Sequence, residues 1–231
     1  MILYPHGPID FVDDGLFLVS GRWKRSPLER KMTVFLLSTG EVAVHSAIAM
    51  DEAGMASLQA IGRPSWILVP NRLHASDAGW YANRYPSARV LVPAAVRGRL
   101  FDTLERIDGS LDEDWPETLR GELAIVPLRG TRIGEVAFVH GPSRTLVLTD
   151  AVFNYGGADL SWLARVFMRV NRAYDRFGPS RIFTSFVVSD REAFSASIGA
   201  LLEHDFDRVI MSHGRMLATG GKAAIRDAFS T

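Results

Sequence analysis

Two chemically active side chains stand at the ends of apolar segments whose composition is typical of buried β-strands. Asp150 follows residues 145–149, and His213 comes just after residues 207–211. A carboxylate at the end of a core strand needs a partner, because an unpaired buried charge is very costly. Imidazole and carboxylate groups are also the ligands that zinc uses in proteins. The two residues are therefore candidates for one polar site.

A third apolar segment, residues 66–70, is followed by Asn71, His74 and Asp77. A sheet fixes the direction of strand-end side chains, so three strand ends suit a metal site built from distant parts of the chain. Each residue alone also has an ordinary explanation, because an aspartate can cap a loop and a histidine can be bonded within the core. Their joint occurrence at three strand ends favours a functional site.

Other motifs narrow the chemistry further. His45 ends another expected strand, residues 41–45, and is either a further member of the site or bonded to a carbonyl. The sequence contains no Gly-x-Ser-x-Gly elbow, no Gly-x-Gly-x-x-Gly motif and no Walker loop. It contains no cysteine, which excludes disulfides, thiolate ligands and a cysteine nucleophile. Any metal must be held by nitrogen and oxygen ligands.

Charge and apolar content exclude further classes of protein. The chain has 26 basic and 26 acidic residues, whereas a general nucleic-acid binder is normally basic. No apolar run reaches the roughly 20 residues needed to cross a bilayer. The N-terminus lacks the pattern of a signal peptide, so the cytoplasm is the expected location. We expect residues 1–231 to form one domain that acts on a small molecule.

The elements that must position these side chains are predicted from periodicity and turn residues. Residues 11–19 are expected to form a strand or a hairpin that turns at Asp14-Gly15. The other expected strands cover residues 32–37, 41–45, 66–70, 89–92, 123–128, 135–139, 145–149, 181–188 and 208–211. The expected helices cover residues 51–61, 94–107, 159–177, 192–204 and 221–229. Hairpins argue against a purely parallel sheet. The mixture favours two sheets packed face to face, with helices outside.

The predicted helix 159–177 comes directly after Asp150 and is strongly amphipathic. Apolar residues recur at three- and four-residue steps, while arginines, including Arg165 and Arg169, take the other face. One interpretation is a solvated arginine face. A second is a cover over the site that offers guanidinium groups to an anionic substrate. A third is contact with an acidic membrane surface.

The order of several short motifs also matches a known superfamily. These motifs are Val-Pro-Asn71-Arg-Leu-His74, Leu-Thr-Asp150-Ala-Val-Phe and Ser-His213-Gly. On them, the chain resembles the metallo-β-lactamase superfamily, and within it a group of uncharacterised bacterial proteins. The resemblance spans nearly the whole chain and implies an α/β fold, a four-layer αββα sandwich. It also implies a zinc or iron site at one edge of the sheets, where an activated water attacks an ester, amide, thioester or phosphoester.

The resemblance assigns Asp150 to the bridging aspartate of the superfamily and His213 to its last histidine. Asn71 stands where the first histidine of the usual His-x-His-x-Asp-His motif is expected. Thr131 takes the place of the mid-chain histidine, and His45 stands where most members carry an aspartate. A full dinuclear site is therefore not expected.

With this depleted motif, we predict a hydrolase holding one zinc or iron ion through His74, Asp150 and His213. Asp77 or an activated water would serve as the base. The alternative is a metal-free, non-catalytic binding or interaction domain that keeps the hydrolase fold. Additional site candidates are His45, Asn71 and Thr131, and candidates for contact with an anionic substrate are Arg165 and Arg169.

Overall fold

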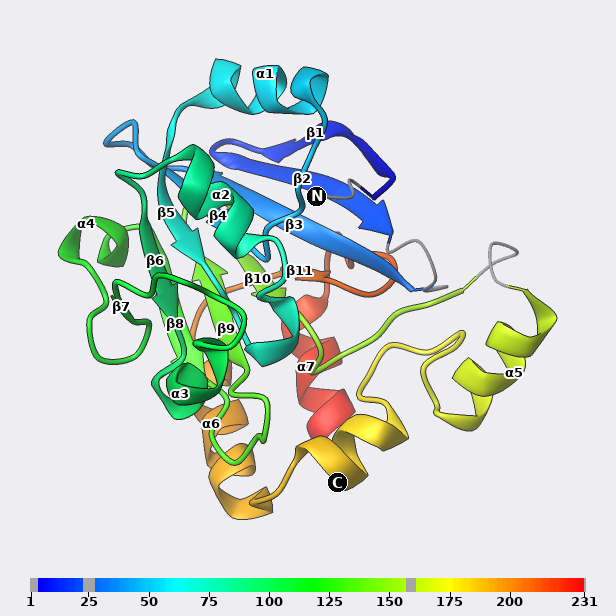
Figure 1. The fold of residues 1–231 in the computed structure, drawn as a ribbon. Helices are drawn as coiled ribbons and strands as arrows, with labels where there is room; N and C mark the ends of the chain where they lie inside the picture. Colours follow the sequence, from blue (N-terminus) through cyan, green and yellow to red (C-terminus); the bar gives the residue numbers. More distant parts are fainter. Residues whose placement is uncertain (1–3, 23–27, 157–160, 231) are drawn as a thin grey trace.

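The computed structural model describes residues 4–22, 28–156 and 161–230. Within these ranges the chain forms a seven-stranded and a four-stranded β-sheet, with helices outside them (Figure 1). The layers follow the order helix, sheet, sheet, helix. The predicted αββα sandwich is therefore confirmed.

The seven-stranded sheet has the strand order β1-β2-β3-β4-β5-β6-β7. Strands β1 to β4 pair as antiparallel neighbours, whereas β4 to β7 pair in parallel. The turns between β1 and β2 and between β3 and β4 contain Gly15 and Gly40, which both have the positive φ that glycine adopts readily. The strands are β1 (His6–Asp13), β2 (Leu16–Arg22), β3 (Glu29–Leu36), β4 (Val42–His45), β5 (Pro64–Leu68), β6 (Arg89–Val92) and β7 (Gly109–Ser110).

The four-stranded sheet has the strand order β11-β10-β9-β8. Its strand β10 is antiparallel to β9 and parallel to β11, and β8 is antiparallel to β9. The strands are β8 (Leu123–Pro127), β9 (Val136–His140), β10 (Thr145–Leu148) and β11 (Arg208–Met211).

Helices cover the outer faces of both sheets. In Figure 1, α1 and α2 lie against the first sheet, α6 and α7 lie against the second, and α5 stands at the outer edge of the molecule. None of the helices within the described ranges is both long and apolar enough to cross a membrane. The helices are α1 (Glu52–Ile61), α2 (Ala78–Arg84), α3 (Arg97–Leu100), α4 (Glu117–Arg120), α5 (Trp162–Val170), α6 (Arg191–Glu203), α7 (Gly221–Phe229), the 3₁₀-helices η1 (Arg72–His74) and η2 (Ala94–Val96), and the π-helix η3 (Phe183–Val187).

The apolar core is divided among the layers. One cluster contains residues of both sheets, such as Phe35, Phe138 and Ile210, and so lies between them. A second joins the first sheet to α1 and α2, and a third joins the second sheet to α6 and α7. Burial on both sides explains why β4, β9 and β10 are apolar along nearly their whole length.

The predicted strand at residues 181–188 is wrong. This segment is helical and includes η3, where the N–H of Val188 donates to the carbonyl of Phe183 at 2.9 Å. Phe183 and Val187 both pack on the core cluster of the second sheet. Their four-residue spacing is the period of a helix, which the apolar composition of the segment concealed.

Two predicted helices are shorter than expected. The helix predicted over 159–177 ends at Val170, because Arg172 has a left-handed φ of 56°. Its first two residues lie outside the described part of the chain. The helix predicted over 94–107 consists of η2 followed by α3, which ends at Leu100.

Candidate metal centre

The register of two parallel strands places Asp150 beside His213. Strands β10 and β11 are neighbours in which Leu148 pairs with Met211. Asp150 and His213 each lie two residues beyond this pair. The two side chains therefore come to the same edge of the second sheet.

His74 reaches this edge from the first sheet. The chain leaves β5 and enters η1, where the side-chain oxygen of Asn71 accepts from the N–H groups of Leu73 and His74 at 2.7 and 3.1 Å. This cap fixes the direction in which η1 begins. The N–H of Val136 donates to the carbonyl of Pro70 at 2.9 Å, which joins the end of β5 to the second sheet.

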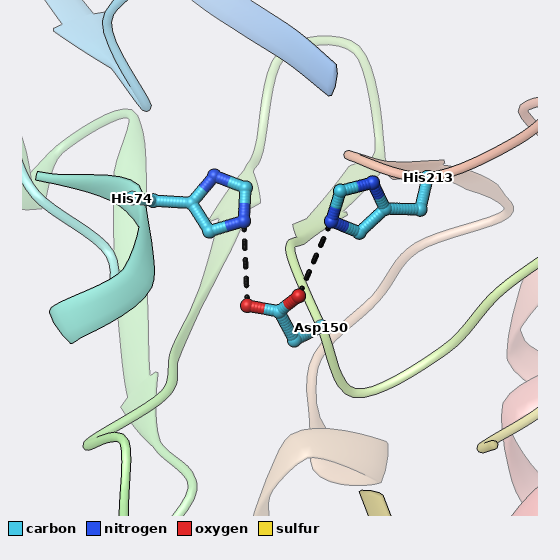
Figure 2. A group of neighbouring side chains, drawn as sticks. All are labelled: His74, Asp150 and His213. Atoms are coloured by element: carbon cyan, nitrogen blue, oxygen red, sulfur yellow. Dashed lines mark ion pairs between the residues drawn. The ribbon is translucent and has the colours of Figure 1, made fainter. Parts of the chain in front are cut away.

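His74 and His213 flank the carboxylate of Asp150, as Figure 2 shows. His74 Nε2 lies 3.3 Å from Asp150 Oδ2, and His213 Nε2 lies 3.2 Å from Asp150 Oδ1. One nitrogen or oxygen of each residue lies within 4.8 Å of the others. In the described ranges no other histidine or acidic residue belongs to this group. We call these three residues the triad.

Outer hydrogen bonds orient both imidazole rings. His213 Nδ1 lies 2.6 Å from the carbonyl oxygen of Glu29, and His74 Nδ1 lies 2.8 Å from Ser46 Oγ. A carbonyl only accepts, so His213 Nδ1 carries a proton. In the neutral ring, Nε2 then presents its lone pair to Asp150. Such an approach of two acceptors requires a cation between them, either a metal ion or a proton.

Neighbouring side chains hold the loop that carries His213. The imidazole ring of His213 stacks on the ring of Phe153, with 5.4 Å between ring centroids and 9° between the planes. The ammonium of Lys31 donates to the carbonyl of Gly214 and, at 3.0 Å, to a carboxylate oxygen of Glu29. Lys31 is buried, so these contacts satisfy a charge that would otherwise be costly.

Asn71 supports the triad as a donor. Its side-chain oxygen is occupied by the η1 cap, so Nδ2 points to Asp150 Oδ2, Glu135 Oε2 and Thr149 Oγ1 at 2.7, 2.6 and 2.8 Å. An amide nitrogen in this orientation has hydrogens to donate and no lone pair for a metal. The geometry therefore makes Asn71 a positioning residue for Asp150.

The partly buried carboxylate of Asp150 and the buried carboxylate of Glu135 have opposite pKa shifts. Burial acts to raise the pKa of Asp150, but the charges of His74 and His213 and their hydrogen bonds hold it well below its usual range. Burial, followed by the charge of Asp150, raises the pKa of Glu135. Glu135 Oε1 accepts from the N–H groups of Thr149 and Asp150 at 2.8 and 3.0 Å. Through these two hydrogen bonds Glu135 fixes the backbone directly after β10, where Asp150 lies.

Asp77, the expected base, is placed outside the triad. Its carboxylate pairs with the guanidinium of Arg30 and accepts from the N–H of Ala49 at 2.9 Å. Both charged side chains are buried. Asp77 therefore joins β3 to the segments around η1 and α2, and the structure does not bring it into the triad.

His45 and Thr131 also lie outside the triad. His45 is buried at the end of β4, between the rings of Phe35 and Phe138, with centroids 6.4 and 4.8 Å away. Burial, followed by the charge of His74, lowers the pKa of His45 to about 3. Thr131 Oγ1 donates to the carbonyl of Leu128 at 2.9 Å and so serves a turn. Neither residue is a ligand in this geometry.

Arg165 and Arg169 were expected to meet an anionic substrate at the site. Both lie on α5, which Figure 1 shows at the outer edge of the molecule. The guanidinium of Arg169 lies over the ring of Tyr174, 4.9 Å from its centroid. The structure does not bring either arginine to the triad, because α5 packs through Met168 and Ala164 on a separate cluster around Tyr155.

Sequence reasoning missed Glu135, Ser46 and Lys31 as supporting residues. Glu135 and Lys31 are charged residues next to apolar strand segments, which is a signal of buried pairing. Ser46 has a left-handed φ of 54° directly after β4. Such strain points to a constrained position but cannot be recognised from residue type.

Comparison with known proteins identifies the fold. No protein-family model matches the chain, and no curated protein matches its sequence. The structure of DIM-1 metallo-β-lactamase matches with a TM-score of 0.69 and 15% identity, over 98% of this chain and 97% of that one. The metallo-β-lactamase FIM-1 from Pseudomonas aeruginosa, in its mono-zinc form, matches with a TM-score of 0.60 and 12% identity, over 97% and 92%.

A flavoprotein shares the same architecture. A fragment of a putative diflavin flavoprotein from Nostoc sp. PCC 7120 matches with a TM-score of 0.64 and 10% identity, over 99% of this chain and 94% of that one. The chain therefore has the metallo-β-lactamase fold, as the resemblance predicted. Because one fold hosts different chemistries, function must be argued from the triad.

Proposed function

We propose that the protein is a metal-dependent hydrolase that holds one divalent ion through His74, Asp150 and His213. The observation that carries the proposal is the orientation of the two rings. Metal-ligating histidines usually have an outer hydrogen-bond partner at the ring nitrogen that does not face the ion. Here Glu29 and Ser46 are the partners at Nδ1, and both Nε2 atoms face one carboxylate, an arrangement that calls for a cation.

The donor set fits zinc or iron. Two imidazole nitrogens and one carboxylate oxygen leave coordination positions open, as catalytic sites require. When bound, such an ion supplies Lewis-acid chemistry, polarising a carbonyl or phosphoryl group and lowering the pKa of water. The substrate class we propose is a small molecule with a hydrolysable ester, thioester, amide or phosphoester bond.

The chain itself supplies orientation. Glu29 and Ser46 hold the two rings through Nδ1, while Asn71 holds Asp150 through Oδ2. The Asn71 hydrogen bond also favours the ionised form of Asp150, because a donor stabilises a carboxylate. These residues keep the ligand atoms in place before any ion binds, which reduces the cost of ordering the site.

A hydrolysis assay tests the proposal. Purified protein is loaded separately with zinc and with iron, then assayed against panels of esters, thioesters, amides and phosphoesters. We expect one class to be hydrolysed and Asp150→Ala to lower kcat/KM by at least about 100-fold. His204→Ala, at the end of α6, is the matched control and keeps full activity. Activity retained by a folded Asp150→Ala protein contradicts the proposal.

One observation favours a second candidate, a metal-free binding domain. Asp150 already receives a hydrogen bond from Asn71, and two protonated imidazoles would complete its partners without an ion. This candidate predicts that neither zinc nor iron raises the melting temperature. A bound ion raises it, because a ligand that binds only the folded state stabilises that state.

A further inference from the structure

The apolar face of α5 points to solvent. Met168 is buried and, with Ala164, fastens the helix to a small cluster around Tyr155. The opposite side is an apolar stripe that continues along the helix at positions i, i+1, i+4, i+5 and i+8. This stripe consists of Trp162, Leu163, Val166, Phe167 and Val170, which are 66%, 63%, 47%, 55% and 60% exposed.

The exposed apolar surface continues beyond the helix. The N–H of Arg181 donates to the carbonyl of Asn171 at 2.8 Å, which places the next helical segment beside the end of α5. There Ile182 and Phe186 are 43% and 73% exposed. Of the 11 exposed large hydrophobic residues in the described ranges, seven belong to these two segments. Such a concentration marks an interaction surface.

Positive charge accompanies this surface. Residues 161–182 contain five arginines, and Asp175 is their single acidic residue. Within the described ranges, none of the ion pairs involves these arginines. Three of them, with Arg191, line a cavity of about 360 Å³ in which Asp227 is the single carboxylate. The five arginines are Arg165, Arg169, Arg172, Arg176 and Arg181.

We propose that α5, together with Ile182 and Phe186, docks on an anionic phospholipid surface. The apolar stripe enters the boundary between headgroups and acyl chains, and the arginines pair with lipid phosphates. Trp162 suits this boundary because aromatic rings favour the membrane interface. A helix of nine residues is too short to span the bilayer, so α5 lies along it.

Charge complementarity selects this occupant over a second copy of the chain. In a two-fold symmetric dimer the same patch meets itself, so the α5 arginines of one copy, Arg165 and Arg169, would approach those of the other. An anionic bilayer offers the opposite charge and an apolar interior in one surface. The sandwich carries α5 at its outer edge (Figure 1), where it can approach a flat surface.

Vesicle sedimentation tests this proposal independently of catalysis. The full chain is mixed with vesicles of phosphatidylcholine alone or of phosphatidylcholine with phosphatidylglycerol. We expect sedimentation only with the anionic vesicles, and weaker sedimentation as salt rises, because salt screens the arginines. Phe167→Glu should lower the bound fraction by about tenfold or more, since it places a carboxylate in the apolar stripe.

Phe101→Glu is the matched control, because Phe101 is 57% exposed and Phe167 is 55% exposed. It should bind anionic vesicles like the unchanged protein, and circular dichroism should show that both variants are folded. Three results would overturn the proposal. These are no binding to anionic vesicles at low salt, equal losses in both variants, or a dimer in light scattering that Phe167→Glu dissociates.

Discussion

The chemistry of the site at the residue scale depends on Asn71. Asn71 stands where the superfamily carries a histidine and was predicted as an additional site residue, and the structure shows an amide that donates to Asp150 and Glu135. In this structure Asn71 therefore supports Asp150, one of the three residues of the triad. Against the raising effect of burial, the charges and hydrogen bonds of His74 and His213 keep the pKa of Asp150 low, and Asn71 adds one more hydrogen bond to the carboxylate.

Replacing Asn71 with aspartate tests this supporting role. Asn71→Asp has nearly the same shape but puts a third carboxylate against Asp150 and Glu135. We expect urea unfolding to show a loss of about 3–5 kcal/mol at neutral pH. The new carboxyl should have a raised pKa, so the loss should shrink as the pH falls and the group is protonated.

Asn83→Asp is the control, since Asn83 is exposed on α2. This variant should change the free energy of unfolding by less than about 0.5 kcal/mol. Equal effects of the two substitutions would contradict the role assigned to Asn71.

Because the ring of His45 is buried, we expect the folded state to lose stability at acidic pH. Its nitrogens have no hydrogen-bond partner, and burial lowers its pKa from 6.5 to about 3. As the pH falls below 6.5, the unfolded chain therefore binds a proton that the folded chain does not, and the folded state loses stability. His45→Leu should remove this loss, while the metal content stays unchanged.

Urea unfolding between pH 7 and pH 4 measures the effect of His45. The unchanged protein should lose about 2–3 kcal/mol more over this range than His45→Leu does. His204→Leu serves as the control and should follow the unchanged protein. Parallel pH profiles for the unchanged protein and His45→Leu would show that His45 is not buried as a neutral ring.

At the element scale, the site follows from the register of β10 and β11 and from the turn after each strand. Gly214 follows His213 with φ of 107°, a conformation that side chains rarely adopt. A Cβ at this position would clash with the carbonyl of Asn154. The close approach of the two turns therefore requires glycine here.

Gly214→Ala should displace His213 as well as destabilise the fold. We expect a loss of about 2–4 kcal/mol, from the strained φ together with the clash, and at least tenfold weaker zinc binding. Gly40→Ala is the control, because Gly40 has φ of 83° and open space around it. It should cost about 1 kcal/mol and leave zinc affinity unchanged. Equal zinc affinities in the two variants would contradict the account of this turn.

The sequence predicts an element correctly where its pattern of apolar residues matches the burial of that element in the folded protein. The strands that precede Asp150 and His213 were predicted because buried strands are continuously apolar. The prediction failed at η3, where Phe183 and Val187 have helical spacing in a segment of strand-like composition. It could not foresee that Asp77 would pair with Arg30, because that contact joins residues 47 positions apart.

The whole molecule shows why the site could be only partly predicted. The αββα arrangement brings the ends of β5, β10 and β11 together. From this arrangement we could predict that His74, Asp150 and His213 are neighbours, as the structure shows. The residues that support them reach the site from neighbouring strands: Glu135 contacts the N–H groups of Thr149 and Asp150 within the second sheet, and Ser46, after β4, contacts His74, after β5. Such contacts depend on tertiary packing and leave little trace in local sequence.

Elemental analysis tests the central claim most directly. Protein is purified without added metal, and zinc, iron and manganese are measured in the unchanged chain, in Asp150→Ala and in His204→Ala. The account predicts close to one ion per chain in the first and third proteins, and near none in Asp150→Ala. An unchanged protein without stoichiometric metal, or an Asp150→Ala protein that keeps its ion, would contradict it.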